Sequence, residues 1–192
     1  MRIFIAVLVL IFGFQSWTKA DDIRDFEIEG MSIGDSLLDY FSVSEIKNFV
    51  NYDHLPSNMK FRIAEFYQKN YNMKQYDGMQ VYYKPKDKNF IIYGLNGNLY
   101  CSKKTECKKL YNKIKSDISK NFSGKEHTKK HRDDKSGKSF ATMYIVEIED
   151  GTIIVSYSNW SKEVLYKDTV AVELSLLEVD NWIENNWGLD NN

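Results

Sequence analysis

The sequence predicts an α+β fold in the order ααβββ-αβββ-α, with an antiparallel sheet of about six strands in two meanders and helices packed on one face. Two observations carry this prediction. Segments rich in β-branched and aromatic residues are separated by the turn dipeptides Asp77-Gly78 and Asp150-Gly151, as in strands joined by hairpins. One long segment repeats its apolar residues with the period of an α-helix.

Two short helices are expected near the start of the sheet region. The first, over residues 36–41, has apolar residues at helical spacing, and Gly34 or Asp35 precedes it as a cap. The second begins at Ser42, because Ser42 and Glu45 have the spacing of a capping box and an apolar run follows them.

The first meander is expected over residues 60–101. Residues 60–67 also suit a helix, but their β-branched and aromatic content favours a strand. Residues 79–84 and 90–95 are the next two strands, separated by a turn at 85–88. The dipeptide Asn96-Gly97 predicts a turn or bulge that leads into residues 98–101.

A long helix is expected over residues 105–122, with Thr105 as its cap. Its apolar positions, spaced as one helix face, are Cys107, Leu110, Tyr111, Ile114, Ile118 and Phe122. Residues 123–138 contain no large apolar side chain and are expected to form a mobile polar loop. Strands then follow over 140–149, 152–160 and 169–176, and a short closing helix carries Val179, Trp182, Ile183 and Trp187.

Residues 1–20 have the pattern of a secretory signal peptide. Arg2 precedes an apolar run over residues 3–14, and a polar stretch ends at Ala20, after which cleavage is expected. The apolar run is shorter than the ~20 residues of a membrane span, and no Cys follows the cleavage site to accept a lipid. Residues 21–192 are therefore expected to form a single periplasmic or secreted α+β domain, in which 21–102 and 103–192 are candidates for two similar halves.

Three segments resemble an uncharacterised family of exported proteins from marine alphaproteobacteria. Residues 25–41 read DFEIEGMSIGDSLLDYF, residues 76–84 read YDGMQVYYK and residues 88–97 read KNFIIYGLNG. That resemblance implies an export address and carries no known activity. In addition, GMSIG at 30–34, before a helix pair and a meander, is similar to the outer-membrane assembly lipoprotein BamE and to modules like the β-lactamase inhibitor protein, which implies a binding role. The Cys that anchors BamE to lipid is missing here.

Cys101 and Cys107 are the only cysteines. An even number in an oxidising compartment predicts a disulfide, and the alternative is two reduced structural thiols. The spacing is not that of a C-x-x-C redox site. Two cysteines are also too few for a Cys₄ zinc site.

Charge is distributed unevenly along the chain. Residues 103–138 contain thirteen bases and five acids, whereas residues 139–192 contain two bases and ten acids. The basic segment is either neutralised inside the fold or forms a surface for an anionic partner. The second reading makes Lys125, Lys129, Lys130 and Arg132 candidate contacts for an anionic envelope component, with the membrane contacted only peripherally and no nucleic acid bound.

No catalytic, metal or cofactor site is expected. His127 and His131 have the spacing of a helical metal pair, but Glu126 precedes the first His, and the surrounding bases repel a cation. Candidate carboxylates for acid–base chemistry are Asp35, Asp39, Glu147, Glu149 and Glu173, of which the three glutamates are expected to point outward from strands. No P-loop, nucleophile elbow or dinucleotide motif occurs.

The aromatic residues allow two interpretations. Trp160, Trp182, Trp187, Tyr82, Tyr83, Tyr93, Tyr100 and Tyr157 either pack in the core or line a face that binds sugar or peptide. The sequence therefore favours a non-catalytic periplasmic module that binds an unknown protein or an anionic envelope component, or assists envelope assembly. The alternative is a small periplasmic hydrolase. A pocket with convergent polar groups favours the hydrolase, and an apolar patch or open strand edge favours the binding module.

Overall fold

The computed structural model describes residues 22–49, 59–69, 71–131 and 134–187. Its helices are α1 (Val43–Asn48), α2 (Lys104–Ser119) and α3 (Leu177–Trp187), with 3₁₀ turns η1 (Ile23–Asp25) and η2 (Leu37–Asp39). A short hairpin pairs β1 (Glu27–Ile28) with β2 (Met31–Ser32). The remaining strands are β3 (Arg62–Tyr67), β4 (Gly78–Tyr83), β5 (Ile92–Tyr100), β6 (Lys125–Lys130), β7 (Phe140–Ile148), β8 (Gly151–Asn159) and β9 (Thr169–Leu176).

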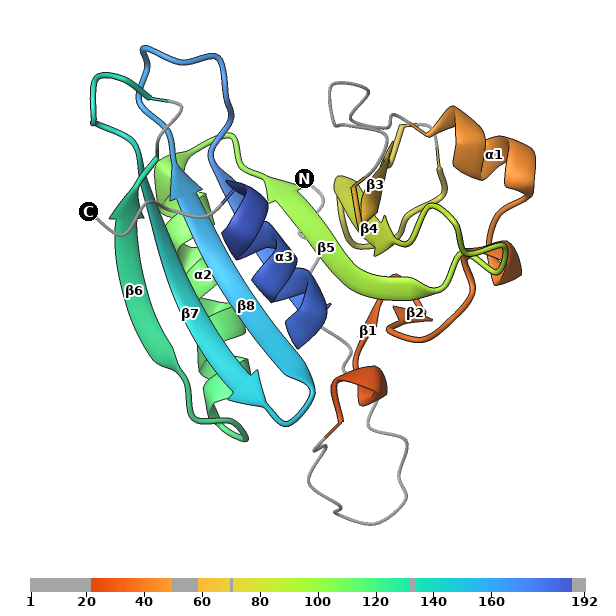
Figure 1. The fold of residues 1–192 in the computed structure, drawn as a ribbon. Coiled ribbons are helices and arrows are strands. Elements are labelled where there is room, and N and C mark those ends of the chain that lie inside the picture. The colour runs from red at the N-terminus through yellow and green to blue at the C-terminus, as the bar shows by residue number, and fades with distance from the viewer. Residues whose placement is uncertain (1–21, 50–58, 70, 132–133, 188–192) are drawn as a thin grey trace.

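One antiparallel sheet of seven strands organises the described residues. Its strand order is β3-β4-β5-β9-β8-β7-β6, so the meanders β3–β5 and β6–β9 are joined where β5 pairs with β9 (Figure 1). The α+β class and the two meanders are confirmed, and the sheet has seven strands instead of about six. Both of the suggested halves contribute strands to this single sheet.

Helices cover both faces of the sheet, so the expectation that all of them pack on one face is wrong. α2 and the N-terminal segment lie on one face, and α3 lies on the other (Figure 1). The reason lies in strands that are apolar on both sides. In β3, Phe66 belongs to the core on the α2 side, whereas Ile63 belongs to the cluster that contains Trp182 of α3. A strand buried on both faces needs cover on both.

The larger core lies on the α2 side of the sheet. The N-terminal turns insert Ile23 and Leu37 into it, and neither side chain is exposed to solvent. Each fully buried apolar side chain of this size contributes about 1.5–3 kcal/mol to folding. The aromatic rings at the β3 side of this core, which lie in edge-to-face or tilted contact, are Phe41, Phe49, Phe66 and Tyr71.

The segment 123–138 is not simply a polar loop, because Lys125–Lys130 forms strand β6 at the edge of the sheet. Its backbone pairs with β7 from Lys125↔Ile145 to Lys130↔Phe140. Most of its side chains are exposed on both faces, so no apolar alternation marks the strand in the sequence. Lysines on such an edge also disfavour pairing with a strand from another molecule.

Asn96 and Gly97 lie inside β5 and do not form the expected turn or bulge. The glycine has a packing reason instead. A Cβ added at Gly97 would lie 2.6 Å from the ring of Tyr76, which is closer than van der Waals contact allows. Gly97 therefore makes room for a buried tyrosine in the middle of a strand.

The helix starts agree with the sequence in part. The capping box of Ser42 and Glu45 at α1 is confirmed. The first predicted helix is only the 3₁₀ turn η2, capped by Ser36 and not by Gly34 or Asp35. α2 begins after Lys103, which makes no side-chain cap, so the expected cap at Thr105 is wrong.

A hairpin that the sequence did not reveal ties the N-terminal segment to the sheet. Glu29, at its turn, has a positive φ of 55°. Its carboxylate accepts hydrogen bonds from the backbone N–H groups of Lys74, Gln75 and Tyr76 at 2.9, 2.6 and 2.9 Å. This contact fixes the loop before β4 to the β1–β2 turn.

The expected signal peptide and its cleavage site lie outside the described residues. Within the part of the chain that the structure describes, no helix has the length and apolar character needed to cross a membrane.

A candidate binding surface at one end of the sheet

Three connections meet at the end of the sheet where β5 and β8 finish and β9 begins (Figure 1). We call this region the loop end and define it as residues 101–103, 131, 134–139 and 160–168. Each connection leaves a strand whose neighbours in the sheet are fixed by backbone pairing. The loop end is therefore built on a rigid support, the usual arrangement of binding loops.

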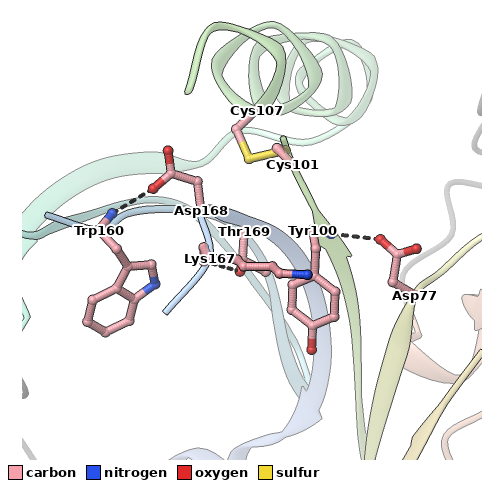
Figure 2. Close-up of a disulfide and its surroundings, with 8 residues drawn as sticks. All are labelled: Asp77, Tyr100, Cys101, Cys107, Trp160, Lys167, Asp168 and Thr169. Atoms are coloured by element: carbon pink, nitrogen blue, oxygen red, sulfur yellow. Dashed lines mark hydrogen bonds between the residues drawn. A yellow bond between two sulfur atoms is a disulfide. The ribbon is translucent and has the colours of Figure 1, made fainter. Parts of the chain in front are cut away.

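A disulfide anchors the first connection. Cys101 and Cys107 are bonded, with Cα atoms 5.6 Å apart, so the end of β5 is tied to α2 as predicted. The Cys101 backbone N–H also donates to the carbonyl of Asp168 at 3.0 Å, and the Asp168 carboxylate accepts from the backbone N–H of Trp160 at 2.8 Å (Figure 2). The disulfide thus supports the two ends of the connection between β8 and β9.

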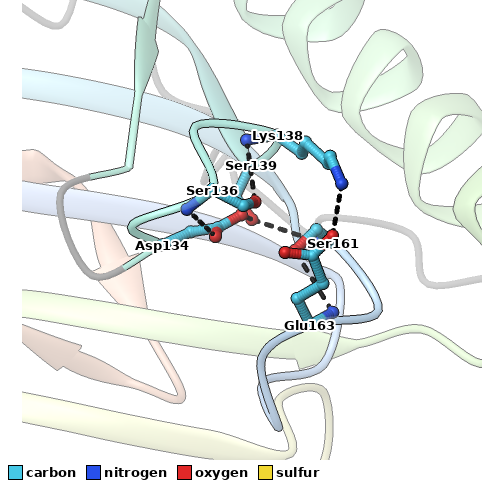
Figure 3. Close-up of polar contacts among 6 residues, drawn as sticks. All are labelled: Asp134, Ser136, Lys138, Ser139, Ser161 and Glu163. Carbon is cyan, nitrogen blue, oxygen red and sulfur yellow. Dashed lines mark hydrogen bonds and ion pairs between the residues drawn. The ribbon is translucent and has the colours of Figure 1, made fainter.

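A buried carboxylate anchors the other side of that connection. Asp134 accepts hydrogen bonds from the Ser136 N–H at 2.9 Å and from the Ser139 hydroxyl at 2.5 Å. The Ser139 hydroxyl oxygen in turn accepts from the Ser161 N–H at 2.8 Å (Figure 3). Hydrogen bonds from Ser136 and Ser139 hold the pKa of Asp134 well below its usual range, so the carboxylate stays charged and joins the two loops.

Aromatic and aliphatic side chains gather on this support. We call His131, Trp160, Leu165 and Tyr166 the aromatic patch. The Trp160 ring stacks on His131 with centroids 3.9 Å apart and contacts Tyr166 at 4.6 Å. Leu165 is fully exposed and Tyr166 is 58% exposed. The rings of Trp160 and Tyr100 point away from the disulfide (Figure 2).

The other aromatic residues considered from the sequence have different places. Tyr82, Tyr83, Tyr157 and Trp182 are buried in the cores, and Tyr93 is partly buried against the α3 cluster. Trp187 closes α3. Of that set, Trp160 lies in the loop end, and Tyr100 is the last residue of β5 beside it. Leu165 and Tyr166 were not among the candidates from the sequence, and His131 was considered there only as a metal ligand. Leu165 and Tyr166 lie in a short segment whose apolar residues have neither helical nor strand periodicity. The sequence pattern therefore does not show that these side chains are exposed.

The four basic residues predicted to contact an anion do not form one cluster. Glu126 of β6 accepts hydrogen bonds from Tyr111 and Lys115 of α2, so its face of the strand looks toward α2, and Lys130 shares that face. Lys125 and Lys129 lie on the opposite face, where Lys129 influences the pKa of Glu173. Arg132 lies outside the described residues.

A second set of lysines lies along one side of α2. Lys104, Lys108 and Lys115 occupy positions i, i+4 and i+11 and so share a side of the helix. Lys104 donates to the Asn159 side chain at 2.5 Å and to the Trp160 carbonyl at 3.0 Å. This side of α2 therefore lies next to the strands β6–β8. We call the surface formed by Lys104, Lys108, Lys115 and Lys130 the basic flank. It adjoins the aromatic patch through Trp160.

The histidine pair has strand geometry. His127 lies within β6 and His131 follows it, so four residues of extended chain separate their Cα atoms by about 13 Å. On a helix the same spacing would bring the two rings together. Within the described residues, no group of three or more His, Cys, Asp or Glu side chains is arranged to hold a metal ion. The absence of a specific metal site stays a prediction.

Two carboxylates lie between the sheet and α3. Burial raises the pKa of Glu173 to about 7, with a further contribution from the negative charge of Asp180. Burial also raises the pKa of Asp180, although hydrogen bonds from Ser175 and Thr152 oppose it. Both hydroxyls come from the sheet, so Asp180 ties the first turn of α3 to it. The expectation that Glu173 points outward into solvent is wrong, whereas Glu147 and Glu149 are exposed.

The remaining candidate carboxylates have structural surroundings. Asp35 accepts hydrogen bonds from the Ser32 N–H at 2.8 Å and from the Tyr40 hydroxyl at 2.6 Å, and Asp39 is exposed in η2. A small pocket between the N-terminal segment, α2 and the sheet is lined almost wholly by apolar side chains such as Phe26, Ile118 and Leu174. Neither place brings together the acid, base and nucleophile that hydrolysis needs.

Comparison of the chain with family models, curated proteins and solved structures finds no match.

Proposed function

We propose that the protein is a non-catalytic binding module of the periplasm, an envelope accessory that contacts an anionic component through its loop end. The observation that carries this proposal is the exposure of Leu165 and Tyr166 on a connection braced by a disulfide and a buried carboxylate. Two adjacent exposed apolar side chains on a rigidly supported loop offer a partner a fixed apolar contact.

The charges at the loop end favour an anionic partner. Its acids already have partners: Asp134 accepts from serines, Asp168 accepts from Trp160, and Glu163 pairs with Lys138. The neighbouring lysines of the basic flank, Lys108 and Lys130, are exposed. In the described part of the chain, no carboxylate lies within ion-pair distance of either one. These cations therefore remain available to an anionic partner.

Export to the periplasm is part of the same proposal. The signal-peptide pattern of residues 1–20 motivates it, and a disulfide between Cys101 and Cys107 is compatible with an oxidising compartment.

Binding of a soluble polyanion tests the charge component. Dextran sulfate should bind the mature chain at low salt, and added salt should weaken that binding because exposed charges are screened. The pair Lys108→Gln and Lys130→Gln should weaken it roughly fivefold, since each exposed ion pair is worth about 0.5 kcal/mol. Fluorescence anisotropy of labelled dextran sulfate measures the change.

The matched control is the pair Lys86→Gln and Lys88→Gln, which removes the same charge from an exposed turn at the opposite end of β5. It should bind as the wild type does. Equal losses in both pairs would mean that only net charge matters and that the basic flank is not a site.

One observation favours the alternative, a small hydrolase. A carboxyl with a pKa of about 7, as in Glu173, is poised for acid–base catalysis near neutral pH. Turnover of ester, peptide or glycoside test substrates that disappears in Glu173→Gln, while the fold is retained, would support this alternative. Our proposal expects no turnover above background in either protein.

A further inference from the structure

The connection between β8 and β9 has an apolar tip. Leu165, at 105% of its reference exposure, is the most exposed large hydrophobic side chain among the described residues, and Tyr166 follows it at 58%. A fully exposed leucine gains nothing from a partner that offers only charge. It gains free energy where a partner supplies apolar surface.

Hydrogen bonds, an ion pair and ring contacts hold the tip of this connection in an exposed position. Beyond the contacts from Ser139 and Asp168 at its two ends, the Val164 N–H donates to the Ser161 carbonyl at 3.4 Å, and Glu163 pairs with Lys138 of the neighbouring loop. The Trp160 ring, stacked on His131, lies against Tyr166. Because these contacts order the loop before any partner arrives, little conformational entropy is lost when the tip is buried.

Cations flank the tip along the chain. Lys162 and Lys167 are exposed on either side of Leu165 and Tyr166, and the Lys167 ammonium lies 6.0 Å from the ring of Tyr100. Among the ion pairs of the described residues, neither lysine has a carboxylate partner. An aliphatic and an aromatic side chain between two lysines is the arrangement that fits the boundary between anionic headgroups and acyl chains.

We propose that the β8–β9 connection inserts Leu165 and Tyr166 into the interfacial layer of an anionic lipid bilayer, while Lys162 and Lys167 contact phosphate headgroups. This inference rests on the proposed binding function and names lipid as the anionic component. The tyrosine ring suits the interface because it presents an apolar body and a polar hydroxyl. A single small tip with a few lysines gives reversible, peripheral binding and no stable anchor.

Vesicle sedimentation tests the insertion. The mature chain should bind vesicles of phosphatidylglycerol and phosphatidylethanolamine, and bind vesicles of phosphatidylcholine at least tenfold more weakly. Leu165→Ser with Tyr166→Ser should weaken binding to the anionic vesicles about tenfold or more, because the burial of two apolar side chains is lost. Lys162→Gln with Lys167→Gln should weaken it roughly thirtyfold and reduce its salt dependence.

Two controls separate insertion from general effects. Leu38→Ser removes a leucine that is 39% exposed at η2, on a different part of the molecule, and should leave vesicle binding unchanged. Binding of dextran sulfate should be unaffected by the Leu165 and Tyr166 substitutions, because that probe has no apolar phase. In addition, brominated lipids should quench a Tyr166→Trp variant more strongly than a Leu38→Trp variant.

The outcomes distinguish this inference from the function on which it rests. If the wild type binds dextran sulfate but no vesicles, the lipid assignment is wrong and the proposed anionic binding survives. If it binds neither at low salt, both fail. If the variant Leu165→Ser with Tyr166→Ser binds vesicles as strongly as the wild type does, the insertion is overturned. The lysines would then be sufficient for vesicle binding.

Discussion

Glu173 is a single residue whose protonation state affects the stability of the fold. Its row of the sheet places it between Asn96 of β5 and Ile154 of β8, and within the described residues the buried Oδ1 atom of Asn96 has no hydrogen-bond partner. A carboxylate at this half-buried position loses part of its hydration and also faces the negative charge of Asp180. The protonated form of Glu173 is therefore favoured in the folded state.

The stability of the protein should consequently fall as pH rises from 5 to 8. The pKa of Glu173 is about 7 in the fold and 4.5 ordinarily, so its stabilising contribution is complete below pH 4.5 and is lost as pH rises through 7. The full effect is at most about 3 kcal/mol, at 1.36 kcal/mol per pKa unit. Glu173→Gln should flatten the profile, which urea unfolding at pH 5 and pH 8 measures.

The control at the same scale is Glu147→Gln, which replaces an exposed glutamate of β7 and should leave the pH profile as in the wild type. The raised pKa of Asp180 acts in the same direction, so a small slope should remain in Glu173→Gln. A wild-type protein that is more stable at pH 8 than at pH 5 would refute the assignment.

Residues differ in how far the sequence reveals them. Cys101 and Cys107 were predictable as a pair, because two cysteines admit one connectivity. The surroundings of Glu173 were not, since a glutamate in an alternating strand has the same pattern whether its face is open or lies under a helix. The exposure of Leu165 was equally hidden, because it depends on which loops surround it.

At the scale of elements, the disulfide between β5 and α2 supports more than its own helix. Its removal by Cys101→Ala with Cys107→Ala should lower the free energy of unfolding by about 2 kcal/mol, from the closure entropy of a seven-residue loop. Because the Cys101 N–H donates to Asp168, amide hydrogen exchange should also quicken over residues 160–168. Urea unfolding and exchange measured by mass spectrometry check the two effects.

Chemical reduction of the wild type should reproduce the double alanine variant. If reduced and oxidised proteins unfold at the same urea concentration, the disulfide is energetically neutral. If stability falls but exchange over 160–168 does not change, the bond supports α2 alone.

Elements with a strong pattern were predictable, and edge elements were not. The span 169–176 and the capping box of α1 agree with the structure, because apolar alternation and side-chain capping are local properties. β6 was missed since an edge strand exposed on both faces needs only its backbone partners. The need for a glycine at position 97 of β5 was also hidden, because it arises from Tyr76, which packs against that position from outside the strand.

The whole molecule is expected to be an exported one. If residues 1–20 are a signal peptide, the exported chain should begin at Asp21 and carry one disulfide. Intact-mass measurement of the periplasmic fraction checks both properties together. A chain that keeps residues 1–20 in the membrane fraction would show that the segment is an uncleaved anchor.

The sequence could not predict that helices cover both faces of the sheet, because this depends on the arrangement of the whole chain. Short apolar runs such as residues 60–67 fit a strand covered on one side or on two, and only the position of α3 decides between them. That position depends on the order of strands, which brings β9 between β5 and β8.

The central place of β9 also sets a temporal order on folding. Among the described residues it is the last strand in sequence, and it joins the two meanders through partners as far apart as Gly94↔Ser175. A growing chain that has not reached residue 169 holds two separate ribbons with unpaired inner edges at β5 and β8. The complete sheet is therefore assembled only when synthesis is nearly finished, and contacts of long sequence separation make that step slow.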